Sequence, residues 1–173
     1  MNKLLSIGVI LLGCLLSSNS ALADEHSEAF ENINNFHFVS KQLASSGMLK
    51  LEEYEHIKHY GFKHVINLIP GMQLKEKRHV ESLGMSYEQI PVIWDTPTLD
   101  NFKQFSAFMK SYGDDKIYVH CELNWRASTF VYLYRVTQLN MSKEKAIQDL
   151  EQIWEPKDQW DAFIVSTLAH YKK

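Results

Sequence analysis

The residues with the clearest chemical potential in this 173-residue chain lie between positions 117 and 128, in the order Ile-Tyr-Val-His-Cys-Glu-Leu-Asn-Trp-Arg-Ala-Ser. The apolar residues from Ile117 to His120 predict a buried strand, and the apolar stretch that follows Arg126 predicts a helix. A short loop between a strand and a helix N-terminus gathers backbone N–H groups and the positive end of the helix dipole, so it binds anions. Such a loop also stabilises the thiolate of Cys121, which is the form of cysteine that acts as a nucleophile.

Three side chains around Cys121 could support this chemistry. Arg126 carries a rigid fork of N–H donors that matches a tetrahedral oxyanion. Ser128 carries a hydroxyl that could donate a hydrogen bond to the thiolate. His120 precedes Cys121 in the predicted strand, so its side chain points to the opposite face. We therefore expect His120 to hold the loop by hydrogen bonds from below and not to act as a base.

The chain contains two cysteines, Cys14 and Cys121. Cys14 lies in a predicted signal peptide, so Cys121 is expected to be alone in the mature chain, where no internal disulfide can form. A single cysteine is often a small apolar residue of the core. The position of Cys121, between His120 and a helix start that carries Arg126, favours a reactive thiolate instead.

The order His-Cys, four residues, Arg and a nearby Ser resembles the active loop of the cysteine-dependent phosphatase superfamily, of the tyrosine and dual-specificity type. The flanking sequence resembles a small bacterial phosphatase branch, also described as the phosphatase-like domain of beta-lactamase-hydrolase-like proteins. The similarity extends over residues 36 to 138, through Phe38–Ser40 with Gln42, Gly61–Leu68, Gly84–Tyr87 and Ile90–Val92. It implies an α/β fold with a mostly parallel central sheet flanked by helices, and an active loop between a central strand and a buried helix.

The resemblance also implies roles for individual residues. Cys121 is expected to be the nucleophile and Arg126 the clamp for phosphate oxygens, with no metal or cofactor. The phosphate is expected to lie on the loop that consists of Glu122, Leu123, Asn124, Trp125, Arg126 and Ala127. Asp95, in Trp-Asp-Thr-Pro, is expected to be the general acid that protonates the leaving alcohol. The alternative interpretation of Asp95 is an ordinary turn residue, and Asp100 in the next helix is a second candidate for the acid.

The loop departs from the phosphatase pattern in its length. Phosphatases of this superfamily place five residues between Cys and Arg, and here there are four, Glu122 to Trp125. A gapless alignment puts Asn124 at the usual glycine but Ala127 at the Arg position, whereas one deletion aligns Arg126. The four-residue spacing also resembles the rhodanese sulfurtransferases, in which the loop cysteine carries a persulfide. A third hypothesis is a loop that binds phosphate without catalysis, because the carboxylate of Glu122 repels an anion unless it points outward.

Strands and helices are expected to alternate along the chain, which predicts a mostly parallel α/β sheet. Strands are expected at Phe36–Ser40, His64–Leu68, Tyr87–Ile93 and Lys116–His120. Helices are expected at Leu49–Tyr60, Leu74–Leu83, Thr98–Tyr112, Arg126–Leu139, Lys143–Trp154 and Pro156–Tyr171. Ligands of such sheets bind at the carboxyl ends of the strands, which is where the loop after His120 lies.

Residues 1–23 have the three parts of a signal peptide: Lys3 near the start, an apolar run from Leu4 to Leu16, and an Ala-Leu-Ala site that ends at Ala23. The apolar run is shorter than the roughly 20 residues that a spanning helix needs. Cleavage after Ala23 predicts a periplasmic or secreted protein. A lipid anchor on Cys14 is the minor alternative.

Residues 24–35 are predicted to be a mobile or loosely packed polar leader, and residues 36–173 a single domain. The formal net charge is −3 and the sequence has no basic run, so we expect no nucleic-acid partner. The expected partner is a small anionic or phosphorylated substrate. After signal cleavage no membrane attachment is expected, and the sequence does not indicate an oligomeric state.

Overall fold

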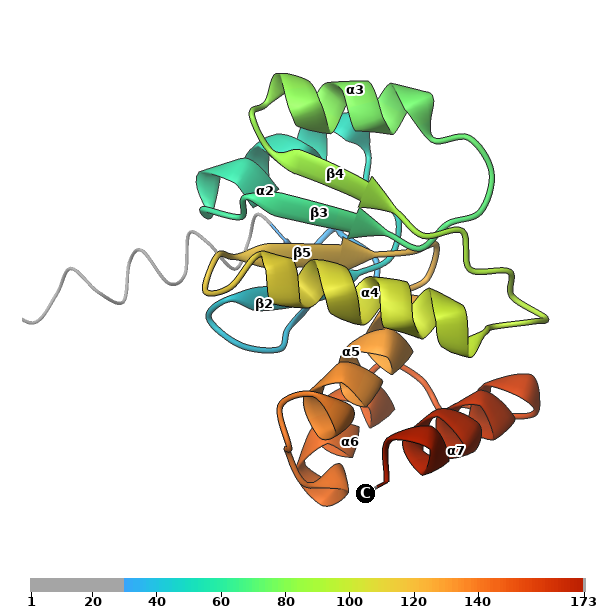
Figure 1. Cartoon of the computed structure of the whole chain (residues 1–173). Helices are drawn as coiled ribbons and strands as arrows, with labels where there is room; N and C mark the ends of the chain where they lie inside the picture. The colour runs from blue at the N-terminus through green and yellow to red at the C-terminus, as the bar shows by residue number, and fades with distance from the viewer. Residues whose placement is uncertain (1–29, 173) are drawn as a thin grey trace, which may run out of the picture.

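The computed structural model describes residues 30–172, and its centre is a five-stranded sheet in the order β1-β2-β5-β3-β4 (Figure 1). The strands are β1 (His37–Phe38), β2 (Leu43–Ser46), β3 (His64–Asn67), β4 (Ser86–Gln89) and β5 (Ile117–His120). All neighbouring pairs are parallel except β1 and β2. The expected mostly parallel α/β fold is confirmed, and β5 occupies the centre of the sheet.

Helices cover both faces of this sheet. They are η1 (Leu51–Glu53), α2 (Tyr54–His59), α3 (Leu74–Ser82), α4 (Leu99–Ser111), α5 (Trp125–Thr137), α6 (Lys143–Glu151) and α7 (Gln159–Tyr171). Apolar residues of α2 and α3 form a core with one face of the sheet, and residues of α4 to α7 form the larger core on the other face. Figure 1 shows α2 and α3 beside β3 and β4, with α5, α6 and α7 grouped together. The helix after the loop, α5, is buried over most of its length, as its apolar sequence predicts.

Two strands differ from the sequence-based expectation. β1 is only His37–Phe38, and β2 was not expected. The sequence of β2 is Leu-Ala-Ser-Ser, which lacks the β-branched and aromatic residues that indicate strands. It forms a strand because it lies between β1 and β5, where all four of its residues are buried.

Other elements lie where they were expected, with ends that differ by a few residues. The predicted helix Leu49–Tyr60 is split into the 3₁₀ turn η1 and the short helix α2. The predicted strand Tyr87–Ile93 ends at Gln89. Pro91 lies just beyond this end, and proline has no N–H with which to continue a ladder.

The expectation of a loosely packed leader up to residue 35 is wrong for its described part. Phe30 and Ile33 are buried, and the ring of Phe30 stacks on that of Phe36 with 4.3 Å between centroids. These residues therefore belong to the folded domain. The predicted signal peptide, its cleavage after Ala23 and the candidate lipid site at Cys14 lie outside the described residues. No helix within residues 30–172 is long and apolar enough to cross a membrane.

Candidate active site

Cys121 and Arg126 meet at one cavity where β5 leads into α5. The cavity has a volume of about 200 Å³ and is lined by Trp94, Cys121, Glu122, Leu123, Trp125 and Arg126. It lies at the carboxyl end of the central strand and at the N-terminus of α5. The structure therefore places the predicted nucleophile and the predicted anion clamp together, where α/β sheets commonly bind ligands.

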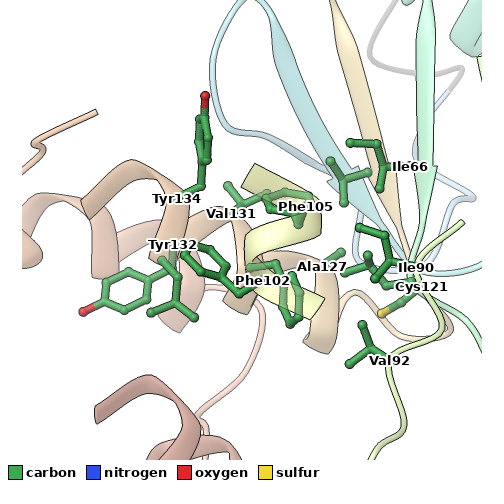
Figure 2. Packing of buried hydrophobic residues seen from close by; sticks show 14 of the residues in the cluster. Ile66, Ile90, Val92, Phe102, Phe105, Cys121, Ala127, Val131, Tyr132 and Tyr134 are labelled. Carbon is green, nitrogen blue, oxygen red and sulfur yellow. The ribbon is translucent and has the colours of Figure 1, made fainter. Parts of the chain in front are cut away.

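Cys121 is buried in the apolar core and still lines this cavity. Its side chain is grouped with Ile90, Val92 and Ala127 (Figure 2). Its backbone N–H donates to the Ser46 carbonyl oxygen at 3.2 Å, which ties the loop to β2. Burial alone would suit an inert core cysteine. The cavity and the cation beside it are the features that separate Cys121 from an ordinary core residue.

Arg126 lies in the first turn of α5 and is only 7% exposed. Its guanidinium carbon is 5.5 Å from the centroid of the Trp94 ring, a cation–π distance. Among residues 30–172 it forms no ion pair, and its buried Nε has no hydrogen-bond partner. A buried cation is costly unless it is paired. The charge of Arg126 therefore favours an anionic ligand in the cavity.

Asn124 turns the chain from the loop into the helix. Its backbone is left-handed, with φ of 67°, and asparagine is one of the few side chains that adopt this conformation readily. Its side-chain amide donates to the Asn35 carbonyl oxygen at 2.7 Å, and the Asn35 amide donates back to the Leu123 carbonyl oxygen at 3.0 Å. This pair of bonds clamps the loop to residues before β1. The N–H groups in the first turn of α5 have no acceptor within the helix, so they can serve an anion.

Gly47 is a site residue that sequence reasoning missed. A Cβ atom there would lie 2.9 Å from the Glu122 carbonyl oxygen and 3.0 Å from that of Asn34. The next residue, Met48, donates its N–H to the Glu122 oxygen at 3.0 Å. The loop thus takes its path because residue 47 has no side chain. An isolated glycine after two serines was the signal that could have indicated such a close approach.

His120 points away from Cys121, toward α2 and α3, as strand alternation requires. Its Nε2 donates to the Glu76 carboxylate at 2.8 Å and lies 3.2 Å from the Tyr54 hydroxyl. We expected the His120 side chain to form hydrogen bonds with the loop. Among the described residues its partners are Glu76 and Tyr54. His120 instead anchors the end of β5 to the two helices behind the sheet.

Glu76 is the centre of this polar group, and sequence reasoning missed it because α3 looked like an ordinary charged helix. Its side chain is 11% exposed. The Asn67 amide donates to its two carboxylate oxygens at 3.0 and 3.1 Å. Burial alone would raise the pKa of Glu76, but hydrogen bonds from His120, Tyr54 and Tyr87 lower it below the usual value.

Ser128 has a different partner from the one expected. Its hydroxyl donates to the Asn124 carbonyl oxygen at 2.7 Å and lies 3.2 Å from that of Trp125. Serine commonly bonds to the preceding turn in this way when it lies inside a helix. The expected donation from Ser128 to the Cys121 thiolate is therefore wrong for this conformation, since a hydroxyl has one hydrogen to donate.

Asp95 is exposed in the turn between β4 and α4, directly after Trp94, which lines the cavity. The turn is closed by a bond from the Thr96 N–H to the Ile93 carbonyl oxygen at 3.3 Å. Asp95 is near the cavity but does not line it, so its role as general acid stays a prediction. Asp100 is 90% exposed and pairs with Lys103 at 3.3 Å, which fits a residue that stabilises the start of α4.

Comparison with known proteins agrees with the fold described above. No protein-family model matches the chain, and no curated protein matches it in sequence. A crystal structure named "Putative phosphatase (DUF442)" from Shewanella putrefaciens CN-32 is 29% identical, with a TM-score of 0.73 over 84% of this chain and 99% of that one. The core catalytic domain of the PP-IP phosphatase SIW14 from S. cerevisiae is 17% identical, with a TM-score of 0.66 over 81% of this chain and 86% of that one.

PTPMT1 is also similar, with 17% identity and a TM-score of 0.62 over 78% of this chain and 97% of that one. At this level of identity SIW14 and PTPMT1 show the fold alone. The chain has the fold of the cysteine-dependent tyrosine and dual-specificity phosphatases, as the sequence resemblance implied.

Proposed function

We propose that this protein is a phosphatase that hydrolyses a phosphoester through a cysteinyl-phosphate intermediate. The observation that carries the proposal is that Cys121 and buried Arg126 line the same cavity at the end of β5, and that Arg126 has no ion pair among residues 30–172. The similarity to the Shewanella structure supports it. The substrate is a small anionic or phosphorylated compound. The SIW14 domain was solved with citrate and PTPMT1 with PI(5)P, so proteins of this fold take anionic ligands.

In the first step the Cys121 thiolate attacks the phosphorus atom. A sulfur–phosphorus bond forms while the bond from phosphorus to the leaving oxygen breaks. Arg126 and the N–H groups in the first turn of α5 hold the non-bridging oxygens, where negative charge develops in the transition state. Asp95, which directly follows Trp94 of the cavity wall, donates a proton to the leaving oxygen.

In the second step water attacks the cysteinyl phosphate. Asp95, now a carboxylate, takes a proton from the water as the new phosphorus–oxygen bond forms. The sulfur–phosphorus bond breaks, inorganic phosphate leaves, and the Cys121 thiolate is restored. Glu122 is exposed to solvent at the cavity rim, which weakens its repulsion of the phosphate.

The proposed location is the periplasm or the exterior of the cell, because residues 1–23 have the pattern of a cleaved signal peptide. Cleavage after Ala23 would leave Cys121 as the single cysteine, so oxidation within one molecule could not join it to another thiol. Mass spectrometry of the exported protein, with an N-terminus at Asp24, would support this part of the proposal. An intact N-terminus at Met1 would contradict it.

The experiment that tests the activity is steady-state hydrolysis of an aryl phosphate by the purified protein under reducing conditions. The matched control is Cys121→Ser, which keeps the size of the side chain but replaces the thiolate by a poor nucleophile. Phosphate release that disappears in the control is the expected result. Equal release by the two proteins would refute the mechanism.

Sulfur transfer is a second candidate, favoured by the four residues between Cys121 and Arg126. In this reaction Cys121 takes the sulfane sulfur of thiosulfate, forms a persulfide and releases sulfite. It predicts a mass gain of one sulfur atom on Cys121 after exposure to thiosulfate. Unchanged mass together with aryl phosphate hydrolysis would decide for the phosphatase.

A further inference from the structure

The four tryptophans of the chain are far apart in the sequence and meet beside the Cys121 cavity. Trp94 follows β4, Trp125 begins α5, Trp154 lies between α6 and α7, and Trp160 lies in α7. Trp160 is fully buried, and its ring centroid lies 5.1 Å from that of Trp94 and 6.0 Å from that of Trp154. The other three indoles are half-buried, so part of each ring is open to a ligand.

Trp94, Trp125 and Trp154 form the wall of a second cavity, here called the tryptophan groove, with a volume of about 410 Å³. The rings of Trp125 and Trp154 are stacked there, with centroids 5.3 Å apart and planes 10° apart. Trp94 and Trp125 also line the Cys121 cavity, so the two cavities share a wall. A molecule whose phosphate lies beside Cys121 can therefore extend its other end along this wall into the groove.

The rim of the groove carries one carboxylate that has no charged partner. Four polar residues form this rim, Glu155, Lys157, Asp158 and Gln159. Lys157 and Glu155 pair with each other, with 3.2 Å between Nζ and Oε2. Asp158 forms no ion pair within residues 30–172, and its side chain makes no capping hydrogen bond to α7. Aspartate just before a helix usually caps it, so the Asp158 carboxylate remains available to a cation.

The two cavities therefore favour ligand groups of opposite charge. In the Cys121 cavity the buried guanidinium of Arg126 has no ion pair within the described chain, and the carboxylate of Glu122 is exposed to solvent, so this cavity favours an anion. The groove offers indole faces and the Asp158 carboxylate, both of which attract a cation. One indole of the shared wall already contacts a cation, because the Arg126 guanidinium carbon is 5.5 Å from the centroid of Trp94.

We propose that the tryptophan groove binds a methylated ammonium group, and that the substrate is the phosphate monoester of an amino alcohol that carries this group. The inference rests on the proposed phosphatase function and adds the substrate class to it. Indole faces beside a carboxylate are the surroundings that recognise quaternary ammonium groups. A primary ammonium group needs acceptors for three N–H groups, and tryptophan side chains supply none.

The proposed reaction leaves the ammonium group unchanged. The bond between phosphorus and the oxygen of the amino alcohol breaks as the bond from phosphorus to Cys121 forms. The amino alcohol leaves with the proton that Asp95 donates, and water then releases inorganic phosphate from Cys121. The groove therefore holds the same cation before and after phosphoryl transfer, and its task is to bind and orient the substrate.

The test compares phosphocholine with neohexyl phosphate, an ester of nearly the same shape in which carbon replaces the quaternary nitrogen. Calorimetric titration of Cys121→Ser measures both affinities without turnover. We expect phosphocholine to bind about tenfold more tightly, because a cation on indole faces contributes an affinity of this order. Equal affinities, tighter binding of neohexyl phosphate, or no measurable binding of phosphocholine at millimolar concentration would overturn the proposal.

Substitutions in the Cys121→Ser protein assign this preference to the groove. Trp154→Leu keeps an apolar side chain but removes the aromatic face, so the ratio of the two affinities should fall toward one. In Trp154→Phe the ratio should recover in part. Asp158→Asn should also lower the ratio. The matched control is Asp161→Asn, which changes the net charge equally at an exposed position on α7 that lines neither cavity, and which should leave the ratio unchanged.

The exposed carboxylates keep the test decisive if Trp154→Leu does not fold. Asp158→Asn and Asp161→Asn alter surface side chains, so their ratios can be compared directly. A lower ratio in Asp158→Asn alone supports the groove. The same ratio in both variants would mean that the rim does not bind the cation, which contradicts the proposal.

Phosphate release by the unmodified protein separates this inference from the proposed activity. If no phosphoester is hydrolysed but phosphocholine binds more tightly in a Trp154-dependent way, the groove still binds an ammonium group and the phosphatase proposal fails. If phosphate is released but phosphocholine has no advantage in binding, the phosphatase stands and the ammonium assignment is overturned. Tighter binding of phosphoethanolamine than of phosphocholine would overturn the choice of a methylated ammonium group.

Discussion

Two consecutive residues, His120 and Cys121, point to opposite faces of the sheet. The buried polar groups on the two faces differ in whether they have hydrogen-bond or ion-pair partners. On the Cys121 side the surroundings are apolar, and the cation Arg126 has no acidic partner among the described residues. On the His120 side the carboxylate of Glu76 is surrounded by donors from Asn67, His120 and two tyrosines. On the Cys121 side Arg126 therefore has no ion pair within residues 30–172. On the His120 side the donors bind Glu76 and so join the elements of the fold.

A hydrogen-bonded support lies directly behind Cys121, the proposed nucleophile. A buried carboxylate that accepts several hydrogen bonds fixes the positions of all its donors at once. Glu76 belongs to α3, Asn67 to β3 and His120 to β5, so this group joins three elements. The loop after β5 therefore starts from an anchored residue, and Arg126, which follows the loop, lines the cavity.

The largest expected effect is the loss of stability in Glu76→Ala. This change leaves the buried donors of Asn67 and His120 without their acceptor, and breaking such a group costs about 3–5 kcal/mol of unfolding free energy. The matched control is Glu81→Ala on the same helix, whose exposed ion pair with Lys77 contributes at most about 1 kcal/mol. Urea unfolding measures both. Equal losses of unfolding free energy in the two variants would show that the hydrogen bonds to Glu76 contribute no more than an exposed ion pair.

The second expected effect concerns Arg126, on the Cys121 side of the sheet. Arg126→Lys retains the positive charge but removes the planar fork, so kcat/KM for an aryl phosphate should fall by about 10²–10³. Arg78→Lys, at an exposed position on α3, should retain full activity. Stability should change little, because Arg126 has no ion pair to lose within the described part of the chain. Full activity in Arg126→Lys would show that the planar fork of Arg126 is not needed to hold the phosphate oxygens.

Gly47 tests whether the path of the loop depends on the contact behind it. Gly47→Ala places a methyl group 2.9 Å from the Glu122 carbonyl oxygen, so the loop must shift, at a cost of about 1–3 kcal/mol. We expect lower kcat as well as lower stability. The control is Gly71→Ala, where a Cβ would meet no atom within 4 Å although φ is positive. That variant should lose some stability but keep its kcat.

The smallest expected effect is a pH dependence that comes from Glu76. Its pKa is lower in the folded protein than in the unfolded chain, so its contribution to stability is complete above the unfolded value and is lost as pH falls through the folded value. The difference in unfolding free energy between the unmodified protein and Glu76→Gln should therefore be constant above about pH 5. It should shrink as pH falls from there to the folded pKa, by at most about 1.4 kcal/mol per pH unit. A difference that grows on acidification would mean that burial outweighs the hydrogen bonds.

Local order along the chain was enough to predict the strand, loop and helix around Cys121. Apolar runs and breaker residues are visible in sequence, and the His-Cys-x₄-Arg order carries the phosphatase resemblance. The opposite directions of His120 and Cys121 also follow from strand geometry alone. These features depend on neighbours in the chain, which is why one sequence was sufficient for them.

Contacts between distant segments were decided only by the tertiary structure. β2 is a strand because of its place beside β5, Glu76 is buried because α3 turns it toward His120, and Gly47 matters because the loop passes within contact distance. Ser128 bonds to its own helix, whereas the sequence suggested the thiolate. The four tryptophans meet because α5 and α7 pack together beside the turn after β4. Sequence spacing carries no record of such approaches, since packing of whole elements brings these residues together.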